Sequence, residues 1–287
     1  MYKGKKVLVT GSSGMIGKEL VKQLEELGAN IKKVDKKLMD EMDLTDFNCC
    51  LDVCQDMDYV FHLAGIKGNP KMTQERPVDF IGPMLQFDTN MILAAQKCNV
   101  KRFLYTSSIA VENIKTDIFP AWAKMTGETL IEAMRIQYPK GTDFCIVRPG
   151  NVFGRYDNPN REGCMAITNL IKAALKDEEL VVWGDGYQER DFISAKEVAK
   201  CMIETMENMP EKVVKCGRGH GIKIRDVAAI IINHDNPKIK ATKIKFDETK
   251  PSGEKKRVLD TDWSPATFFP DELKEMIEYA CNNWEIK

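Results

Sequence analysis

The chain has 287 residues, of which 43% are hydrophobic and 30% are charged, and its formal net charge at pH 7 is -1. This length provides enough apolar side chains for one large domain or for two closely joined ones. The charge balance lacks the basic excess typical of nucleic-acid binding, and no apolar run approaches the ~20 residues that a membrane span needs.

The N-terminus, MYKGKKVLVTG, has a basic start followed by an apolar stretch of only a few residues. Such a short stretch predicts a first strand rather than a signal peptide, so we expect a cytoplasmic protein. The nine cysteines fit reduced, packed thiols in that compartment, and we predict no bound metal. Cys49, Cys50 and Cys54 cluster without a histidine near them in the sequence, which leaves a metal site as the weaker alternative.

Strand-like apolar runs alternate with helical patterns through the first half of the chain. The predicted segments, in chain order, are strand 6–11, helix 15–28, strands 31–35 and 59–65, a helix near 84–98, strand 102–108, a helix opened by Pro120 and strand 144–150. This alternation predicts an α/β fold, with a Rossmann doubly wound parallel sheet and helices on both faces.

The pattern changes after about residue 155, where turn-forming segments become frequent. These segments are RYDNPNREG, WGDGYQERD, CGRGHG, NHDNPK and KPSGEKK. The short strands and helices between them predict a smaller C-terminal α/β portion. We therefore divide the chain into a Rossmann domain at 1–160, with a return segment near 181–205, and a second portion at 161–287.

Three glycines follow the first predicted strand at the start of a helix, in the spacing GxxGxxG. In dinucleotide-binding proteins the first glycine permits a tight turn, the second lets the backbone approach a pyrophosphate, and the third lets helix and strand pack closely. The N-terminus of the helix attracts the anion. The motif therefore predicts a dinucleotide cofactor bound by Gly11, Ser13, Gly14, Met15, Ile16 and Gly17.

An acidic residue stands where such cofactors need one. Asp35 closes the next predicted strand, about 18 residues beyond Gly17, where a carboxylate hydrogen-bonds the ribose hydroxyls of adenosine. A carboxylate at this position repels a 2′-phosphate and favours NAD over NADP. Lys36 and Lys37 follow at once and keep NADP open as the alternative.

Two further segments are expected beside the cofactor. Asp43 and Leu44 would flank the adenine, and the end of the third strand would run under the cofactor. We expect His62, within that strand, to be a packing residue. The cofactor contacts predicted from the two segments, together with Asp35, are Lys36, Asp43, Leu44, Leu63, Ala64, Gly65 and Lys67.

With the segments HLAG and TSS and a helix containing AK, the glycine motif resembles the extended short-chain dehydrogenase/reductases, the NAD-dependent nucleotide-sugar epimerases and dehydratases. The resemblance covers essentially the whole chain. Segments PVDFIGPM, LAGIKGN, NVFGRYDN, VVWGDG and FDETKPSGEKKRVLD are similar, in the same order, to those of the GDP-L-fucose synthase branch. The resemblance implies a nucleotide-sugar substrate, with GDP-sugars first, and assigns substrate binding to residues 161–287.

Members of this family surround the C4 oxygen of the sugar with a serine, a tyrosine and a lysine. The lysine ammonium lowers the pKa of the phenol, so that phenolate can take a proton during hydride transfer. By resemblance Ser108 is the serine, with Ser107 as the second choice, and Lys124 is the lysine, which would also orient the cofactor ribose. Pro120 stands at the position of the tyrosine, and no tyrosine lies between Ser108 and Lys124.

A second departure concerns epimerisation. GDP-L-fucose synthases use a histidine and a cysteine as acid and base, but Met165 stands at the histidine position and no cysteine lies near Ser108. The resemblance therefore concerns scaffold and ligand rather than double epimerisation. Tyr156, Tyr187 and Glu112 are candidates for a replacement acid, with an aromatic wall or a solvated carboxylate as the ordinary explanation of each.

The resemblance also implies contacts with the nucleotide sugar. Arg190 would bind the diphosphate with its planar fork, and Trp183 would stack on the base unless it packs in the core. Lys250 begins a basic run that a solvated loop explains equally well. The predicted substrate contacts are Ser108, Asn151, Met165, Trp183, Tyr187, Arg190 and Lys250.

Three functions remain open at this point. The first is NAD-dependent modification of a nucleotide sugar around C4, by epimerase, 4-reductase or dehydratase chemistry. The second is a non-catalytic protein that binds NAD and a nucleotide sugar on the same scaffold, which Pro120 and Met165 suggest. The third is an NADP-dependent reductase of another substrate, which the lysines after Asp35 suggest. The resemblance further implies a homodimer formed by the helices near 84–98 and 121–137.

Overall fold

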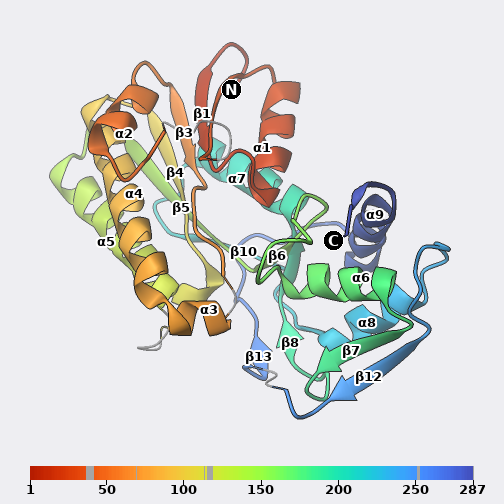
Figure 1. Cartoon of the computed structure of the whole chain (residues 1–287). Coiled ribbons are helices and arrows are strands. Elements are labelled where there is room, and N and C mark those ends of the chain that lie inside the picture. Colours follow the sequence, from red (N-terminus) through yellow and green to blue (C-terminus); the bar gives the residue numbers. More distant parts are fainter. Residues whose placement is uncertain (37–41, 69, 113, 115–118, 251–252, 287) are drawn as a thin grey trace. The chain divides into compact units, whose positions relative to one another are not determined.

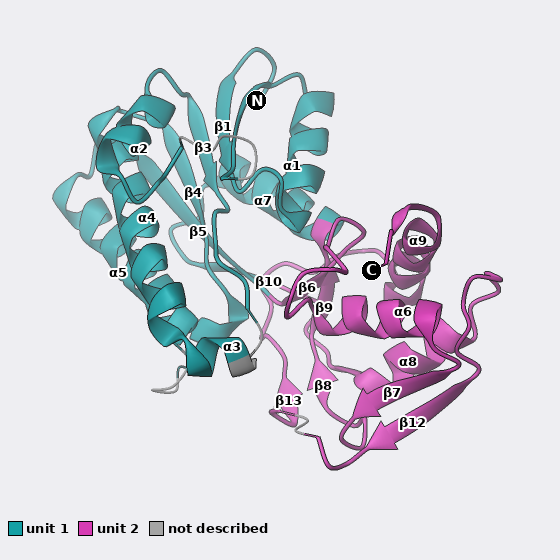
Figure 2. Cartoon of the chain, in the orientation of Figure 1, with its two compact units in different colours: residues 1–149, 196–215 teal, residues 150–195, 216–287 magenta. Residues whose placement is uncertain are grey.

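A computed structural model describes residues 1–36, 42–68, 70–112, 114, 119–250 and 253–286, so that Lys37 lies outside the described residues. The chain forms two compact units (Figure 2). Unit 1 comprises Met1–Pro149 and Lys196–Lys215, and unit 2 comprises Gly150–Ala195 and Cys216–Lys287. From the sequence we divide the chain into residues 1–160 and 161–287 by their expected ligands. That assignment of cofactor and substrate binding stays a prediction.

Unit 1 is built on a six-stranded sheet with the strand order β10-β5-β4-β3-β1-β2. Strand β1 pairs in parallel with β2 and β3, and β4 pairs in parallel with β3 and β5. The strand order reverses between β1 and β3, and open α/β sheets bind ligands beyond the carboxyl ends of the strands at such a reversal. The strands are β1 (Lys6–Thr10), β2 (Asn30–Val34), β3 (Tyr59–His62), β4 (Arg102–Thr106), β5 (Asp143–Pro149) and β10 (Val214–Cys216).

Helices cover both faces of this sheet, with α2, α4 and α5 on one side and α1 and α7 on the other (Figure 1). In α1 the apolar stripe Leu20, Val21 and Leu24 is buried at helical spacing. The predicted doubly wound α/β fold is confirmed. The helices are α1 (Met15–Glu26), α2 (Phe47–Cys54), α3 (Pro70–Glu75), α4 (Pro77–Lys97), the 3-10 helix η1 (Ile109–Val111), α5 (Phe119–Gln137) and α7 (Ala195–Asn208).

The first residues of the chain are packed against α7. The hydroxyl of Tyr2 donates to the carbonyl of Ile203 over 3.1 Å, and both residues are buried. The ring of Tyr2 also packs edge-on against Tyr59, with 6.0 Å between the ring centroids. Helix α7 is therefore part of the same core as the N-terminal residues, although the two are far apart in the sequence.

Unit 2 contains three small sheets and its own core. Strand β6 pairs with β9 and β7 pairs with β12, both in parallel, while β8 lies between β11 and β13. The core includes Phe153, Ile171 and Leu273. The elements are β6 (Asn151–Phe153), α6 (Ala166–Lys176), β7 (Glu179–Trp183), β8 (Glu189–Arg190), β9 (Phe192–Ser194), β11 (Ile222–Lys223), α8 (Ile224–Ile232), β12 (Lys243–Asp247), β13 (Lys256–Arg257) and α9 (Phe269–Asn283).

No helix among the described residues has both the length and the apolar character to cross a membrane. The nine cysteines are free thiols, and all but Cys49 and Cys98 are buried. Within the described parts of the chain, no three His, Cys, Asp or Glu side chains gather into a group that could hold a metal ion.

Candidate active site

The glycine motif forms a turn that leaves no room for side chains at two of its positions. Gly11 has a φ of +67°, and a Cβ there would lie 2.8 Å from the carbonyl carbon and oxygen of Leu63. A Cβ on Gly17 would lie 2.2 Å from the carbonyl oxygen of Gly11. Gly14 caps α1, whose first two residues are Met15 and Ile16. The first N–H groups of a helix lack partners within it, so this turn and helix start can bind an anion.

Asp35 follows β2 and is linked to the same turn. The N–H of Ser13 donates to Oδ2 of Asp35 over 3.2 Å, and the hydroxyl of Ser12 donates to the carbonyl of Val34 over 3.4 Å. Asp35 is half-buried, whereas Lys36 is exposed. The structure thus brings the carboxylate predicted to bind ribose beside the glycine turn.

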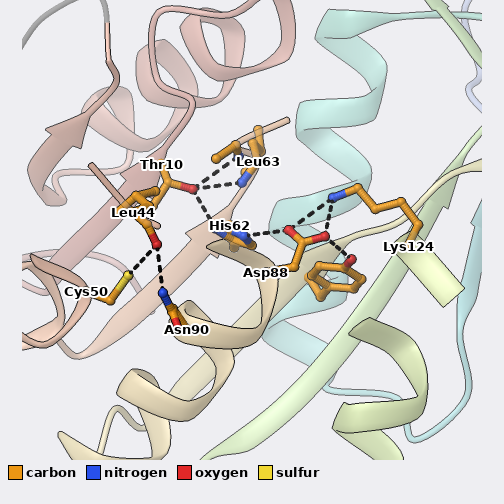
Figure 3. A network of polar contacts seen from close by, with 10 residues as sticks. Thr10, Leu44, Cys50, His62, Leu63, Asp88, Asn90 and Lys124 are labelled. Carbon is orange, nitrogen blue, oxygen red and sulfur yellow. Dashed lines mark hydrogen bonds and ion pairs between the residues drawn. The ribbon is translucent and has the colours of Figure 1, made fainter. Parts of the chain in front are cut away.

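The predicted adenine segment is fixed to the helices behind it. Asp43 is exposed, and hydrogen bonds from the N–H and hydroxyl of Thr45 lower its pKa. Leu44 is buried, and its carbonyl accepts bonds from the thiol of Cys50 and from Nδ2 of Asn90, both over 3.2 Å (Figure 3). The segment is therefore held by α2 and α4.

The segment after β3 is held by the end of β1. The N–H groups of Leu63 and Ala64 both donate to Oγ1 of Thr10, over 3.1 and 3.2 Å. Gly65 and Lys67, further along, are exposed. Because Thr10 is the last residue of β1, these bonds place the segment next to the glycine turn.

Lys124 belongs to a buried polar network (Figure 3). Its Nζ lies 3.3 and 3.2 Å from the two carboxylate oxygens of Asp88 in α4. Asp88 also accepts a bond from the hydroxyl of Tyr105 over 2.6 Å, and it lies 2.9 Å from Nε2 of His62. Nδ1 of His62 lies 2.8 Å from Oγ1 of Thr10. All five residues are buried, and Lys124 keeps the largest exposed fraction, 8%.

The partners in this network determine its protonation. Burial alone would raise the pKa of Asp88, but Lys124 and the bonds from His62 and Tyr105 outweigh it, so the pKa is lowered. Burial lowers the pKa of His62, which is therefore neutral. A carboxylate only accepts, so Nε2 of His62 carries the proton and Nδ1 accepts from Thr10. Burial and the charge of Asp88 raise the pKa of Tyr105 well above its usual value, which keeps the phenol protonated.

Tyr105 is enclosed by the fold and is not an accessible phenol. It is fully buried, and its hydroxyl lies so close to α5 that a Cβ on Gly127 would be 2.4 Å from it. Nζ of Lys124 lies over its ring, 4.7 Å from the centroid. Pro120 is the second residue of α5 and is half-buried. Among the described residues, the polar partner of Lys124 is thus a buried carboxylate rather than an accessible phenol.

The two serines after β4 have different partners. Ser108 is half-buried, and its Oγ accepts from the N–H of Ala110 over 3.2 Å and so caps η1. Ser107 is buried and donates to Glu128, which also accepts from Nε of Arg148 over 2.8 Å. The hydroxyl of Ser107 therefore forms a buried hydrogen bond with Glu128. Ser108 is the better candidate for contact with a substrate.

Two of the candidate replacement acids have structural partners. Burial alone would raise the pKa of Glu112, but bonds from Arg148 and Lys215 outweigh it and lower the pKa. Glu112 is therefore an ion-paired carboxylate rather than an acid. The ring of Tyr156 packs edge-on against Tyr279 in unit 2, with 5.6 Å between the centroids.

Two predicted substrate residues of unit 2, Asn151 and Met165, form hydrogen bonds within that unit. The N–H and Nδ2 of Asn151 both donate to the carbonyl of Asp191, over 2.7 and 3.2 Å. Met165 caps α6, and its N–H donates to the buried carboxylate of Asp157 over 3.4 Å. Their main-chain positions are therefore well defined within unit 2.

The two predicted aromatic contacts lie on the surface of unit 2. Trp183 ends β7 and is 55% exposed, which excludes the alternative that it packs in the core. Tyr187 is 53% exposed, and its ring centroid lies 4.3 Å from the guanidinium carbon of Arg225 and 5.4 Å from Nζ of Lys223. An exposed indole and a phenol beside two cations can stack on a base or attract a phosphate.

The two predicted cations of unit 2 differ in their surroundings. Arg190 is half-buried, and its Nη1 donates to the carbonyls of Glu189 and Glu254, over 2.8 and 2.7 Å. Burial, and next the charge of Arg257, lower the pKa of Arg190. Lys250 is exposed. Arg190 therefore presents a guanidinium held by the main chain, whereas Lys250 is a surface cation.

Within unit 1 the structure brings the glycine turn, Asp35 and the segment after β3 together at the ends of β1, β2 and β3. Sequence reasoning missed Asp88 and Tyr105, and it assigned His62 to packing alone. A signal for Asp88 was present, because it follows Met84 by four residues and precedes Met91 by three, on the apolar stripe of α4. An acid at such a position needs a buried partner.

Comparison with known proteins identifies a family and a curated relative with a similar sequence. The model of a family described as the NAD dependent epimerase/dehydratase family matches residues 7–217. The chain is 27% identical over 317 residues to the probable GDP-L-fucose synthase 1 of Oryza sativa subsp. japonica, with 98% of this chain and 93% of that protein covered.

Solved structures share the fold. A UDP-N-acetylglucosamine 4-epimerase from Methanobrevibacter ruminantium M1, in complex with UDP-N-acetylmuramic acid, has a TM-score of 0.84 at 24% identity, with 98% of this chain and 99% of that chain covered. A GDP-L-fucose synthetase from Naegleria fowleri bound to NADP has a TM-score of 0.81 at 22% identity, with 99% and 94% covered.

Proposed function

The chain belongs to the NAD dependent epimerase/dehydratase family, whose members are NAD(P)-dependent enzymes of nucleotide sugars, and on this premise we propose that it uses NAD to modify a nucleotide sugar around carbon 4. The observation that carries the proposal is the glycine turn. Gly11 and Gly17 leave no room for a Cβ, and Asp35 is hydrogen-bonded to the same turn. This is the arrangement that a dinucleotide needs.

The residues of unit 1 fit NAD. The start of α1 would bind the pyrophosphate, Asp35 would bind the adenosine ribose, and Lys124 would bind a hydroxyl of the nicotinamide ribose. Bound NAD supplies a hydride acceptor, and its reduced form supplies a hydride donor. The half-buried carboxylate of Asp35 would repel a 2′-phosphate, which supports NAD, whereas the exposed Lys36 is the feature that favours NADP.

Unit 2 would bind the nucleotide sugar. Trp183 would stack on the base, Arg190 would bind the diphosphate with Lys250 nearby, and Asn151 and Tyr187 would complete the contacts. Met165 would line the sugar where fucose synthases have a histidine, so we propose oxidation or reduction at C4 without double epimerisation. GDP-sugars are the first candidates, because the rice relative is named a GDP-L-fucose synthase.

The reaction proceeds without the tyrosine. Ser108 would hold the C4 oxygen, and Lys124 would orient the ribose. Loss of a positioned acid typically costs about 10²–10⁴ in rate. We therefore expect a slow enzyme, in which a proton moves through water at the oxygen held by Ser108.

Turnover on a panel of nucleotide sugars tests the proposal. The panel includes 4-keto-6-deoxy sugars with NAD or NADH and then with the phosphorylated cofactors, and products are identified by mass spectrometry and NMR. We expect Lys124→Met to lower kcat about 100-fold or more. The matched control is Lys22→Ala, an exposed lysine on α1, which should retain full turnover.

Binding measurements separate the outcomes of this test. Circular dichroism of Lys124→Met is the folding control, since the substitution leaves Asp88 without its cation. Absence of NAD and NADH binding in calorimetry would falsify the proposal.

The second candidate is a binding protein without turnover. Two features favour it, Pro120 and the ion pair between the ammonium of Lys124 and the carboxylate of Asp88, because each removes a means of activating an alcohol. Binding of NAD and a nucleotide sugar without any product over a day would support this function. A product that disappears in Lys124→Met would exclude it.

The partner is a second copy of the chain. Leu93 on α4 and Trp122 and Ile136 on α5 are 38%, 42% and 83% exposed, which supports a homodimer formed by these helices. Sedimentation velocity of the wild type and of Trp122→Glu tests the dimer, with Leu27→Glu, at the end of α1, as the control.

A further inference from the structure

Asp88 is a carboxylate enclosed within the core of unit 1. It lies in the middle of α4 and is 1% exposed, and its neighbours on the apolar stripe, Met84 and Met91, are also buried. Burying a charge is costly unless the charge is paired and hydrogen-bonded. The side chain therefore needs the partners that surround it.

Among the described residues, the polar contacts of the Asp88 carboxylate are with donors. His62 donates to Oδ1, Tyr105 donates to Oδ2, and Lys124 contacts both oxygens at 3.3 and 3.2 Å. His62 is fixed in turn by Thr10, which also accepts the N–H groups after β3. Strands β1, β3 and β4, together with α4, thus determine where the carboxylate lies. The carboxylate in turn determines where the ammonium of Lys124 lies.

The exposure of the network is uneven. The side chains of His62 and Asp88 are 0% and 2% exposed, whereas the side chain of Lys124 is 10% exposed. Tyr105 and Thr10 are fully buried. Lys124 is therefore the side chain through which this network can meet a ligand.

A purely structural role would not require these groups. A buried ion pair is often no more stabilising than apolar residues of the same volume. The long side chain of Lys124 has many rotamers, and contact with two fixed oxygens selects one direction for its ammonium.

We propose that Asp88 is a positioning residue, which fixes the ammonium of Lys124 for contact with the nicotinamide ribose. The proposal rests on the proposed cofactor and goes beyond it by assigning a function to a residue that cannot itself touch a ligand. The hydrogen bonds that the N–H groups of Leu63 and Ala64 donate to Thr10 do not involve Asp88. Loss of its charge therefore disturbs Lys124 and leaves the glycine turn intact.

The test compares two probes in Asp88→Asn. In the proposed binding mode NADH would reach Lys124, whereas ADP would occupy only the glycine turn and the position beside Asp35. We expect the affinity for NADH, measured by calorimetry, to fall about tenfold or more, while the affinity for ADP stays within about twofold. A loosened fold would weaken both probes, and unchanged NADH affinity in Asp88→Asn would overturn the proposal.

A control variant separates positioning from stability. Tyr2→Phe removes a buried hydrogen bond of unit 1 outside the network, so it should lower the unfolding temperature and leave both affinities unchanged. If it weakens NADH as much as Asp88→Asn does, general destabilisation explains the result and the proposal fails.

A double-mutant cycle keeps the test usable if Asp88→Asn does not fold. The variant Asp88→Asn/Lys124→Met has no unpaired buried charge. We expect its NADH affinity to equal that of Lys124→Met alone, because Asp88 acts through Lys124. A further loss of threefold or more in the double variant would overturn the proposal. Wild-type protein that binds no dinucleotide at all would instead refute the proposed function.

Discussion

The candidate residues of the two units differ in how they are held. In unit 1, Asp88 and His62 are almost completely buried and have hydrogen-bond partners on several elements. In unit 2, Trp183 and Tyr187 are more than half exposed. A buried network fixes geometry, but a change to it disturbs the fold, whereas an exposed aromatic can change with little effect on the fold. The buried residues proposed to orient the cofactor are thus constrained by the fold, and the two exposed aromatics proposed to recognise the nucleotide sugar are open to variation.

The largest expected effect is on NADH affinity, from a substitution in the glycine turn of unit 1. In Gly11→Ala the new Cβ meets the main chain of Leu63 at 2.8 Å, and we expect NADH affinity to fall about 100-fold or more. The control is Gly4→Ala, because Gly4 has a similar φ of +74° but open space around its Cβ position. Calorimetry with NADH measures both variants. Equal affinity in the two would mean that the cofactor does not bind at this turn.

An intermediate effect tests the exposed half. In Trp183→Ala we expect the affinity for the nucleotide sugar to fall about tenfold through loss of stacking, with the unfolding temperature unchanged. Val181→Ala is the control, since Val181 is 41% exposed on the same strand and should keep full affinity. A large drop in unfolding temperature for Trp183→Ala would contradict the assignment of this residue to binding.

The smallest expected effect is the pH dependence of stability that the buried His62 of unit 1 causes. The pKa of His62 is lowered by burial, so the unfolded chain binds a proton that the folded chain does not, and stability falls as pH drops below about 6.5. We expect the free energy of unfolding in urea denaturation to fall as pH drops below about 6.5, by at most about 1.4 kcal/mol per pH unit, the limit for one proton. His62→Gln keeps a donor and an acceptor and should lose this slope.

The titration of Asp88 does not contribute to the loss of stability just below pH 6.5. Its pKa is lowered, so its contribution is present above the unfolded value of about 4 and is lost only at lower pH. Equal slopes in the wild type and His62→Gln would show that His62 does not remain neutral in the folded protein.

Local features of the chain were readable from the sequence. The glycine spacing, the acid that closes β2 and the alternation of strands with helices each depend on residues near one another, and the structure has the predicted turn and sheet. The absence of a tyrosine before Lys124 was equally readable, because it depends only on position along one helix.

The partners of Lys124 were not readable in the same way. Asp88, Tyr105 and His62 come from α4, β4 and β3, and only the sheet order brings them together. The spacing of Asp88 from Met84 and Met91 indicates a buried acid but does not name its partners, and Tyr105 and His62 alone read as a core aromatic and a packing histidine. The exposure of Trp183 likewise depends on how β7 packs in unit 2, which periodicity over five residues does not determine.

The return of the chain to unit 1 at Lys196 has a consequence for synthesis. A nascent chain that has reached Pro149 contains five strands of the main sheet but lacks α7, so the hydroxyl of Tyr2 has no access to the carbonyl of Ile203. Domains generally complete folding as units. Residues 1–149 therefore cannot complete the core of unit 1 until α7 and β10 have been synthesised. By then Gly150–Ala195 of unit 2 have already been made.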